Sequence, residues 1–298
     1  MVIDLLFIKT SGDIFVMKQS TQDPRSNNKM GIMPIRKLIV NMSVPMMISM
    51  LVQALYNIVD SVFVAQIGED ALTAVTLAFP MQNLMISVGA GTGVGINALL
   101  SRALGAREFD KSDKAANNGI LLAFFSFIVS AILGLTITGP FIRSQTSSAD
   151  IIQYGNAYLG IVMTLSFGLF MQVTFERLLQ STGRTMLSMI SQLTGAIINI
   201  FLDPVMIFGL LGCPKLGVAG AAYATVIGQT IASVLGFVMN LKLNRDIHIS
   251  AGAILHPDKK TIGRIYFVGI PSILMMSIGS VMTYLMDLIL IAFSTTAT

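Results

Sequence analysis

Three aspartates stand inside long apolar stretches of the sequence, at Asp60, Asp203 and Asp287. No Lys or Arg lies beside them within those stretches to neutralise their charge. An ionisable residue in such surroundings is costly, so each aspartate is a candidate for binding an ion or carrying a proton. The alternative is a structural role, in which each aspartate makes a buried hydrogen bond or contacts water at the end of its stretch.

Two of these aspartates have polar neighbours at helical spacing. Gln53, Asn57 and Asp60 are separated by four and then three residues, and Asn199 stands four residues before Asp203. Side chains at this spacing share one face of a helix. Carboxylate and amide oxygens are hard ligands of the kind that Na⁺ accepts, and a carboxyl group away from water can also carry a proton. The residues expected around one cavity are Gln53, Asn57, Asp60, Asn199, Asp203 and Asp287.

The stretches that carry these residues are long enough to cross a lipid bilayer. Of the 298 residues, 54% are hydrophobic and only 11% are charged, and the mean hydropathy is +0.76. A soluble domain usually has about 25% charged residues, so the composition indicates a membrane protein. A crossing helix needs about 20 mostly apolar residues. The sequence predicts seven such helices, at 38–65, 71–100, 118–142, 151–174, 186–211, 217–241 and 265–293.

The basic residues lie almost entirely on one side of this predicted membrane topology. Of the 19 Lys and Arg residues, all except Arg143 and Lys215 fall before the first helix or in connections that seven alternating helices place on the same side. By the positive-inside rule, that side and the N-terminus are cytoplasmic in the cytoplasmic membrane. This orientation argues against a seven-helix receptor. Basic residues in short connections between apolar runs also argue against a nucleic-acid partner.

Enzymatic and metal chemistry have no support in the residue pattern. Cys213 is the only cysteine, and His248 and His256 both fall in one polar connection. They form no cluster with the spacing of metal ligands. No HExxH motif is present, and no serine has a base at an identifiable spacing. We therefore predict neither enzyme activity nor a cofactor.

Two further features have simple structural interpretations. The glycine run from Gly89 to Gly95 resembles a nucleotide-binding loop, but no strand precedes it and no lysine follows it. Small residues four apart let helices approach closely, so the run predicts helix packing. Gln172 and Glu176 lie near the cytoplasmic end of the fourth predicted helix, where we expect them to contact water. Arg177 is expected in the connection that follows, which leaves no basic residue inside a predicted helix.

Several motifs follow one another along the chain in a familiar order. They are YNIVDSVFVA at 56–65, LGAR at 104–107, RLLQSTG at 177–183, NIFLDPVMIFG at 199–209 and GVAGAAYAT at 217–225. In combination they resemble the multidrug and toxic compound extrusion (MATE) family of bacterial type, from about residue 30 to the end. The resemblance implies an all-α membrane protein that exports organic cations or drugs in exchange for Na⁺ or H⁺. It also implies a monomer surrounded by membrane lipid, with no cofactor besides the coupling ion.

The resemblance also implies a particular cation site in the N-terminal lobe. In the family, an aspartate of the first helix joins an asparagine and an aspartate of the fifth helix, and a threonine of the sixth helix completes the group. These positions match Asp60, Asn199, Asp203 and Thr225. Asp287 matches less well, because a neutral polar residue is common in that region of the family.

The predicted helix count departs from the family, whose members have twelve helices in two six-helix lobes. We expect a disordered tail or a wrongly assigned start at 1–29 and a six-helix lobe at 30–245. A cytoplasmic connection at 246–264 and the first helix of a truncated second lobe at 265–298 would follow. Two other functions stay open: a flippase for lipid-linked substrates from the same superfamily, and an inactive fragment or membrane scaffold. Such flippases usually carry more basic residues in the cavity than we expect here.

Overall fold

The computed structural model describes residues 33–293, except for the side chains at 287, 288 and 290–293. The described residues form α-helices and one 3₁₀ turn, η2 (Leu210–Gly212), and contain no β-strand. This confirms the predicted class, an all-α membrane protein. The segment 1–29, expected to be a tail or a wrongly assigned start, lies outside the described residues.

Within residues 33–293, six helices are long and apolar enough to cross a membrane by themselves. α6 (Ala149–Thr164) and α7 (Phe167–Ser181) are long and apolar enough only as a pair, and their axes differ by 47°. Counting this bent pair as one crossing gives the seven predicted helices, but the unbroken helix expected at 151–174 is wrong. The six unbroken helices are α2 (Ile35–Ala65), α3 (Glu69–Gly105), α4 (Phe109–Thr136), α8 (Thr185–Phe208), α9 (Val218–Leu243) and α11 (Lys259–Phe293).

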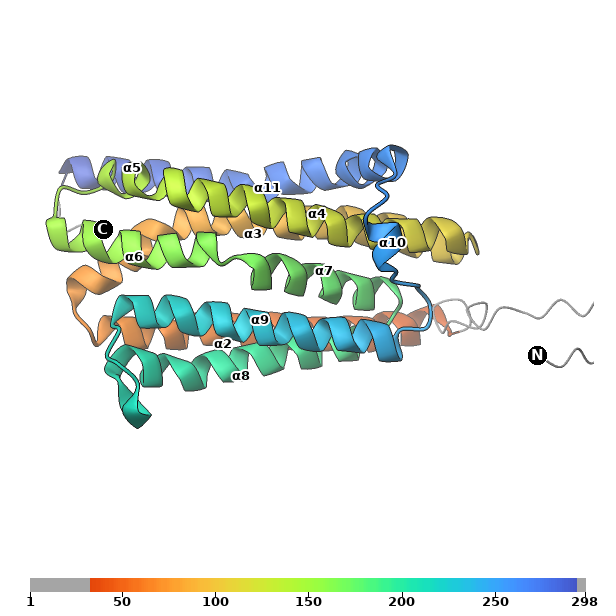
Figure 1. Ribbon diagram of the computed structural model, residues 1–298, viewed down its shortest axis with the longest axis horizontal. Coiled ribbons are helices and arrows are strands. Elements are labelled where there is room, and N and C mark those ends of the chain that lie inside the picture. Colours follow the sequence, from red (N-terminus) through yellow and green to blue (C-terminus); the bar gives the residue numbers. More distant parts are fainter. Residues whose placement is uncertain (1–32, 294–298) are drawn as a thin grey trace, which may run out of the picture.

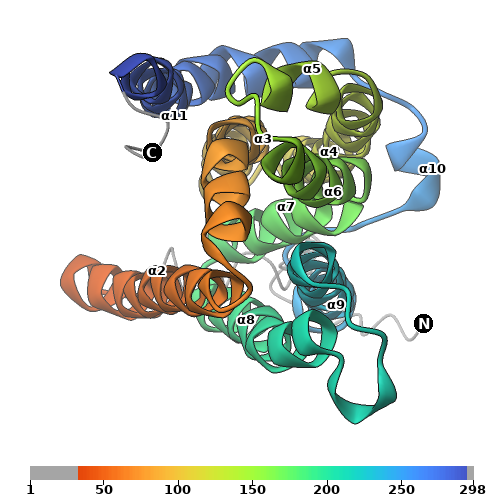
Figure 2. The same ribbon diagram turned by 90° about the vertical axis from the view of Figure 1, so that its left-hand side faces the viewer.

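The long helices run side by side in alternating directions, so their connections lie at two ends of the bundle (Figure 1). We call these the α10 end, which holds α10 (Ala251–Ile254), and the α5 end, which holds α5 (Thr138–Arg143). Viewed along the helices, α7 lies between two groups (Figure 2). It contacts α8 and α9 on one side and α3 and α4 on the other, while α2 packs mainly on α8. α7 is therefore placed to form a wall between the two groups.

A glycine lets α7 lie directly on α9. A Cβ atom at Gly168 would stand 2.7 Å from the backbone nitrogen of Thr230, closer than side chains normally approach. The contact follows the break at Leu165 and Ser166, where neither proline nor glycine interrupts the helix. The helix therefore changes direction next to a tertiary contact. No proline or glycine at the break itself predicts this change.

Three glycines bring α3 and α11 into backbone contact. A Cβ atom on Gly95 would lie 2.1 Å from the carbonyl oxygen of Ile265, and one on Gly91 would lie 2.8 Å from the nitrogen of Ile273. On the facing helix, a Cβ atom on Gly269 would lie 2.9 Å from the carbonyl oxygen of Gly91. This confirms that the glycine run serves helix packing, as small residues commonly do between membrane helices.

The segment from Asn244 to Asp258, which we call the strap, is tied to α4. Asn117 donates from Nδ2 to the carbonyl oxygen of His248 at 2.9 Å and accepts from the backbone nitrogen of Ser250 at 3.0 Å. The backbone nitrogen of His248 also donates to Asp113 at 2.7 Å. These side chains of α4 satisfy backbone groups that a loop would otherwise leave to water.

The strap ends where α11 begins, at Lys259, within the segment expected as a loop. The backbone nitrogen of Asp258 donates to Asn118 at 2.9 Å, which fixes the start of the helix against α4. Asp258 in turn accepts from the hydroxyl of Thr261 at 2.6 Å and from the backbone nitrogen of Lys260 at 3.2 Å. The hydrogen bond from Thr261, followed by that from Lys260, holds the pKa of Asp258 below its usual range.

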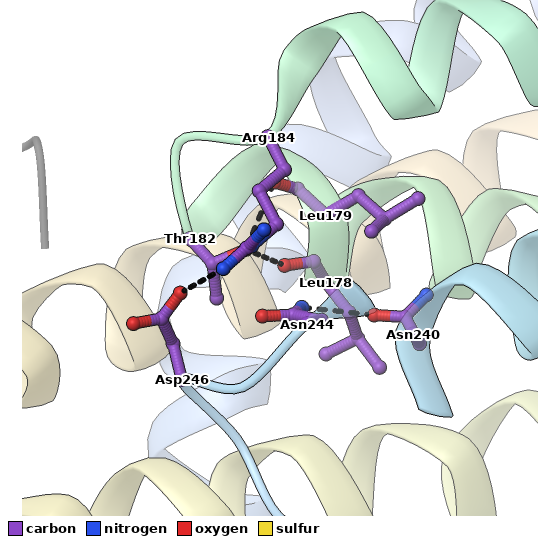
Figure 3. Close-up of polar contacts among 7 residues, drawn as sticks. All are labelled: Leu178, Leu179, Thr182, Arg184, Asn240, Asn244 and Asp246. Atoms are coloured by element: carbon purple, nitrogen blue, oxygen red, sulfur yellow. Dashed lines mark hydrogen bonds and ion pairs between the residues drawn. The ribbon is translucent and has the colours of Figure 1, made fainter. Parts of the chain in front are cut away.

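The other end of the strap meets the turn between α7 and α8 (Figure 3). Arg184 pairs with Asp246 at 3.3 Å, and Asn244 donates to Asn240 at the end of α9 at 3.1 Å. Thr182 closes the turn by donating to carbonyl oxygens of the last turn of α7. The strap therefore joins α4, α8 and α9 at the α10 end.

We expect the Asn117→Leu variant to unfold at a lower temperature and to lose the protection of the strap from hydrogen exchange. Leucine keeps the volume but leaves the carbonyl of His248 and the nitrogen of Ser250 without partners, at a cost of about 1–3 kcal/mol. Thermal unfolding in detergent and exchange at 248–250 measure both effects. The matched control is Asn57→Leu, whose side chain is exposed on α2. Unchanged protection at 248–250 would contradict this role for Asn117.

Candidate functional site

Asn199, Asp203 and Thr225 form a hydrogen-bonded group between α8 and α9. The Nδ2 atom of Asn199 donates to Asp203 Oδ1 at 3.4 Å and to Thr225 Oγ1 at 3.3 Å. Their exposed fractions are 3%, 0% and 4%. The helices meet closely beside them, because a Cβ atom on Gly228 would lie 2.8 Å from the carbonyl oxygen of Gly195. The two glycines therefore allow side chains from different helices to form one compact group.

Asp60 reaches the same group from α2. Its side chain is 8% exposed, and its carboxyl group interacts electrostatically with that of Asp203. Tyr56, one turn earlier on α2, interacts in the same way with both aspartates. The structure thus brings together the four residues expected at the cation site, although they come from three helices.

Three oxygens in this group have no hydrogen-bond donor among the described residues. They are Oδ1 of Asp60, Oδ1 of Asn199 and Oδ2 of Asp203, all shielded from solvent. A buried polar atom without a partner costs about 1–3 kcal/mol, and a charged one costs more. Among the described residues, no three His, Cys, Asp or Glu side chains are arranged to hold a metal ion. The arrangement is chemically suited to a monovalent cation or a shared proton, held by carboxylate, amide and hydroxyl oxygens.

A cavity of about 280 Å³ adjoins the group. Asn199 and Thr225 form part of its wall, so these two residues belong to both the buried group and the cavity. Gln53 faces the cavity from α2 and accepts a hydrogen bond from Gln192 of α8 at 2.8 Å. The cavity lies among helices α2, α3, α7, α8 and α9, and one residue of α11, Met276, also contacts it.

The face of α2 that points inward differs from the expected one. Gln53 and Tyr56 line the cavity and Asp60 is buried, whereas Asn57 is exposed and is not part of the cavity wall. Spacing alone groups Asn57 with Gln53 and Asp60. In the structure, Tyr56 occupies the inward face of α2 in place of Asn57. Asp287 belongs to α11, but its side chain lies outside the part of the chain that the structure describes.

A polar stripe on α7 forms a wall of the cavity that the sequence interpretation missed. Glu176 is only 8% exposed and accepts a hydrogen bond from Gln172 at 2.9 Å. The expectation of water contact at a helix end is therefore wrong for Glu176, whereas Gln172 is partly exposed. Arg177 also lies within α7 and lines the cavity, which corrects its assignment to a connection. The available signal was the four-residue spacing of Gln172, Glu176 and Gln180.

The α7 residues and the buried group lie toward different ends of the cavity. Glu176 is close to the α10 end of α7, whereas Asp203 lies in the last part of α8, toward the α5 end. On α8, the cavity residues Gln192 and Asn199 are seven positions apart, which corresponds to about 10 Å along a helix. Asn199 and the α7 residues line the same cavity, so one molecule of that length has both within the space it occupies.

A family model described as MatE matches residues 45–205. The multidrug export protein MepA of Staphylococcus haemolyticus is 28% identical over 257 residues, covering 86% of this chain and 56% of MepA. The probable multidrug resistance protein YoeA of Bacillus subtilis is 26% identical over 279 residues, covering 92% and 59%. The chain therefore spans a little over half the length of these relatives.

Solved structures are similar over the same part. The outward-facing conformation of a multidrug resistance MATE family transporter of the MOP superfamily aligns with a TM-score of 0.75 and 29% identity, over 80% of this chain and 52% of that one. The MATE multidrug transporter DinF-BH aligns with a TM-score of 0.79 and 30% identity, over 88% and 58%. The arrangement of helices around the buried group is thus shared with solved transporters.

Proposed function

This chain belongs to the MatE family, and from that premise we propose that it is part of an antiporter for organic cations or drugs. The coupling ion is Na⁺ or H⁺, and transport occurs across the cytoplasmic membrane. The observation that carries this proposal is the set of buried, unpartnered oxygens on Asp60, Asn199 and Asp203 beside a cavity. The names of the relatives support drug export but do not identify the coupling ion.

Asn199 and Thr225 connect the proposed ion site to the proposed drug site. Both face the cavity, and both hydrogen-bond within the buried group. A cation bound to the free oxygens of Asp60 and Asp203 would also attract the free amide oxygen of Asn199, and turning the amide toward it would alter the hydrogen bonds that its Nδ2 atom donates to Asp203 and Thr225. Binding at one site would then change the free energy of binding at the other, which is the requirement for coupled exchange.

The chemistry of the cavity wall favours amphipathic cations. Glu176 offers a carboxylate at the wall, methionines and other apolar side chains cover part of it, and Arg177 and several amide side chains complete it. Methionine adapts its shape to different ligands, which suits a site that accepts varied compounds. The larger apolar side chains of the lining are Met46, Met50, Ile86, Leu169, Val173 and Met276.

We propose that the α10 end faces the cytoplasm. Arg143 and Lys215 are the described basic residues on the α5 side, and the others gather toward the α10 end, which satisfies the positive-inside rule. In this arrangement residues 30–245 form a six-helix lobe that carries the ion site. The strap and α11 would lead into a second lobe, and the protein would act as a monomer in membrane lipid.

Ethidium efflux tests the proposed function. The reading frame is expressed in a drug-sensitive host, and efflux is followed after imposing either a Na⁺ or a proton gradient. We expect efflux to depend on one of the two gradients, which would identify the coupling ion. Two results together would overturn the proposal in favour of a scaffold or an inactive fragment. They are the absence of gradient-dependent efflux and the failure of the purified protein to bind ethidium.

A further inference from the structure

Glu176 and Arg177 place opposite charges next to each other on the α7 wall of the cavity. We propose that this pair is a subsite for zwitterionic amphiphiles, in which Glu176 binds the cationic group and Arg177 binds a carboxylate or sulfonate. The inference rests on the proposed function, because it takes the cavity as the substrate site. It assigns the two side chains that would contact the charged groups of such a substrate.

The carboxylate of Glu176 is available to a ligand. One oxygen, Oε1, accepts a hydrogen bond from Gln172 at 2.9 Å, and the other has no donor among the described residues. The residue is more than nine-tenths buried, yet it lines the cavity. A buried carboxylate is stable only when a positive group or further donors compensate the loss of water. The cavity is therefore the place from which a cationic group can reach it.

The guanidinium of Arg177 is held in position but not neutralised. Its stem lies over α3 at Gly93, where a Cβ atom would stand 2.7 Å from its Cγ. One nitrogen, Nη1, donates to Gln180 at 2.9 Å, and Gln180 donates onward to Ser188 at 2.9 Å. Arg177 has no carboxylate within 4.0 Å in the described part of the chain. The remaining N–H groups of its guanidinium can donate to two oxygens of a carboxylate or of a sulfonate.

Helix geometry explains why the two charges do not pair with each other. Successive residues on an α-helix point about 100° apart, so neighbours do not face one another. Glu176 and Arg177 interact electrostatically without forming a direct ion pair. Each charge therefore retains a need for a partner of opposite sign. A single molecule with a positive and a negative group satisfies both, and its apolar skeleton can lie against the methionines of the wall.

Two closely related dyes test the inference. Rhodamine 110 carries a free carboxylate and is zwitterionic, whereas rhodamine 123 is its methyl ester and is a cation. Binding of both dyes to the purified 298-residue chain in lipid nanodiscs can be followed by fluorescence anisotropy. The measured quantity is the ratio of the two association constants, free acid over ester. A general loss of folding would lower both constants and leave this ratio unchanged.

We expect Arg177→Gln to lower the ratio at least about tenfold, because a charge-assisted hydrogen bond is lost only for the free acid. Arg177→Lys keeps the positive charge, so its ratio should lie between those of the wild type and of Arg177→Gln. Glu176→Gln should raise the ratio, since the cation loses its counter-charge and the carboxylate loses a repulsive neighbour. Arg102→Gln and Glu69→Gln are matched controls, because both side chains are exposed.

The outcomes separate this inference from the proposed function. Binding of both dyes with a ratio that Arg177→Gln does not change would overturn the zwitterion subsite and leave cation export intact. An equal fall in the association constants of both dyes in Arg177→Gln, with no recovery of either constant in Arg177→Lys, would show that Arg177 has a structural role only. Failure of the wild-type chain to bind either dye would contradict the cavity as a substrate site, and both proposals would fall.

Discussion

The Asp203→Asn variant should lose Na⁺- or proton-driven efflux of ethidium and, with Na⁺ as the coupling ion, bind that ion at least about 100-fold more weakly. Asp203 is fully buried and supplies one negative charge to the group formed with Asp60 and Asn199. Removing one partner of a buried charge interaction costs about 3–5 kcal/mol, which corresponds to that loss of affinity. Asparagine has nearly the same shape and can still accept the hydrogen bond from Asn199. The loss of efflux should therefore come from weaker cation binding and not from misfolding.

The same substitution should make the cation-free protein more stable. A buried carboxylate with an unpartnered oxygen is unfavourable, and the neutral amide removes this charge. Thermal unfolding of the purified protein with and without Na⁺ measures both effects, because a bound ligand stabilises the folded protein by an amount that grows with the logarithm of its concentration over Kd. Asp150→Asn, at the exposed start of α6, is the matched control. Unchanged efflux in the Asp203→Asn variant would rule out this residue as part of the cation site.

The Gly95→Val variant should be destabilised by at least about 3 kcal/mol, near the upper limit for an overpacked interior. The first atom of any side chain at Gly95 would stand 2.1 Å from the carbonyl oxygen of Ile265. Backbone cannot rotate away as a flexible side chain can, so α3 and α11 would have to separate. Their separation would also disturb the contacts at Gly91 and Gly269.

Gly160→Val separates this clash from the general effect of valine in a helix. Gly160 lies within α6, and a Cβ atom there would meet no atom within 4 Å. Valine has a better helix propensity than glycine, so this control should be neutral or slightly stabilising. Thermal unfolding in detergent gives the comparison, and hydrogen exchange at 265–273 reports on the α11 contact directly. Similar unfolding temperatures for both variants would show that the α3–α11 contact contributes little.

The sequence by itself determined the helices and the centre of the candidate site. Lipid offers no partners for the backbone, so each crossing must be a long apolar helix, and such stretches are readable from composition. Asn199 and Asp203 were identifiable as a pair, because a four-residue spacing places both on one face of any helix. Asp60 was identifiable because a charge in an apolar stretch is rare. These features are local and depend on no neighbouring helix.

The tertiary structure decided which way each helix faces and what lines the cavity. Spacing alone could not choose between Tyr56 and Asn57, because the rotation of α2 is set by its packing on α8. The position of Arg177 on the cavity wall depends on the space left by Gly93, a residue of a different helix. The break before α7 and the attachment of the strap to α4 likewise depend on contacts between residues far apart in the chain. Such contacts follow from how helices pack, and a single sequence carries no local signal for them.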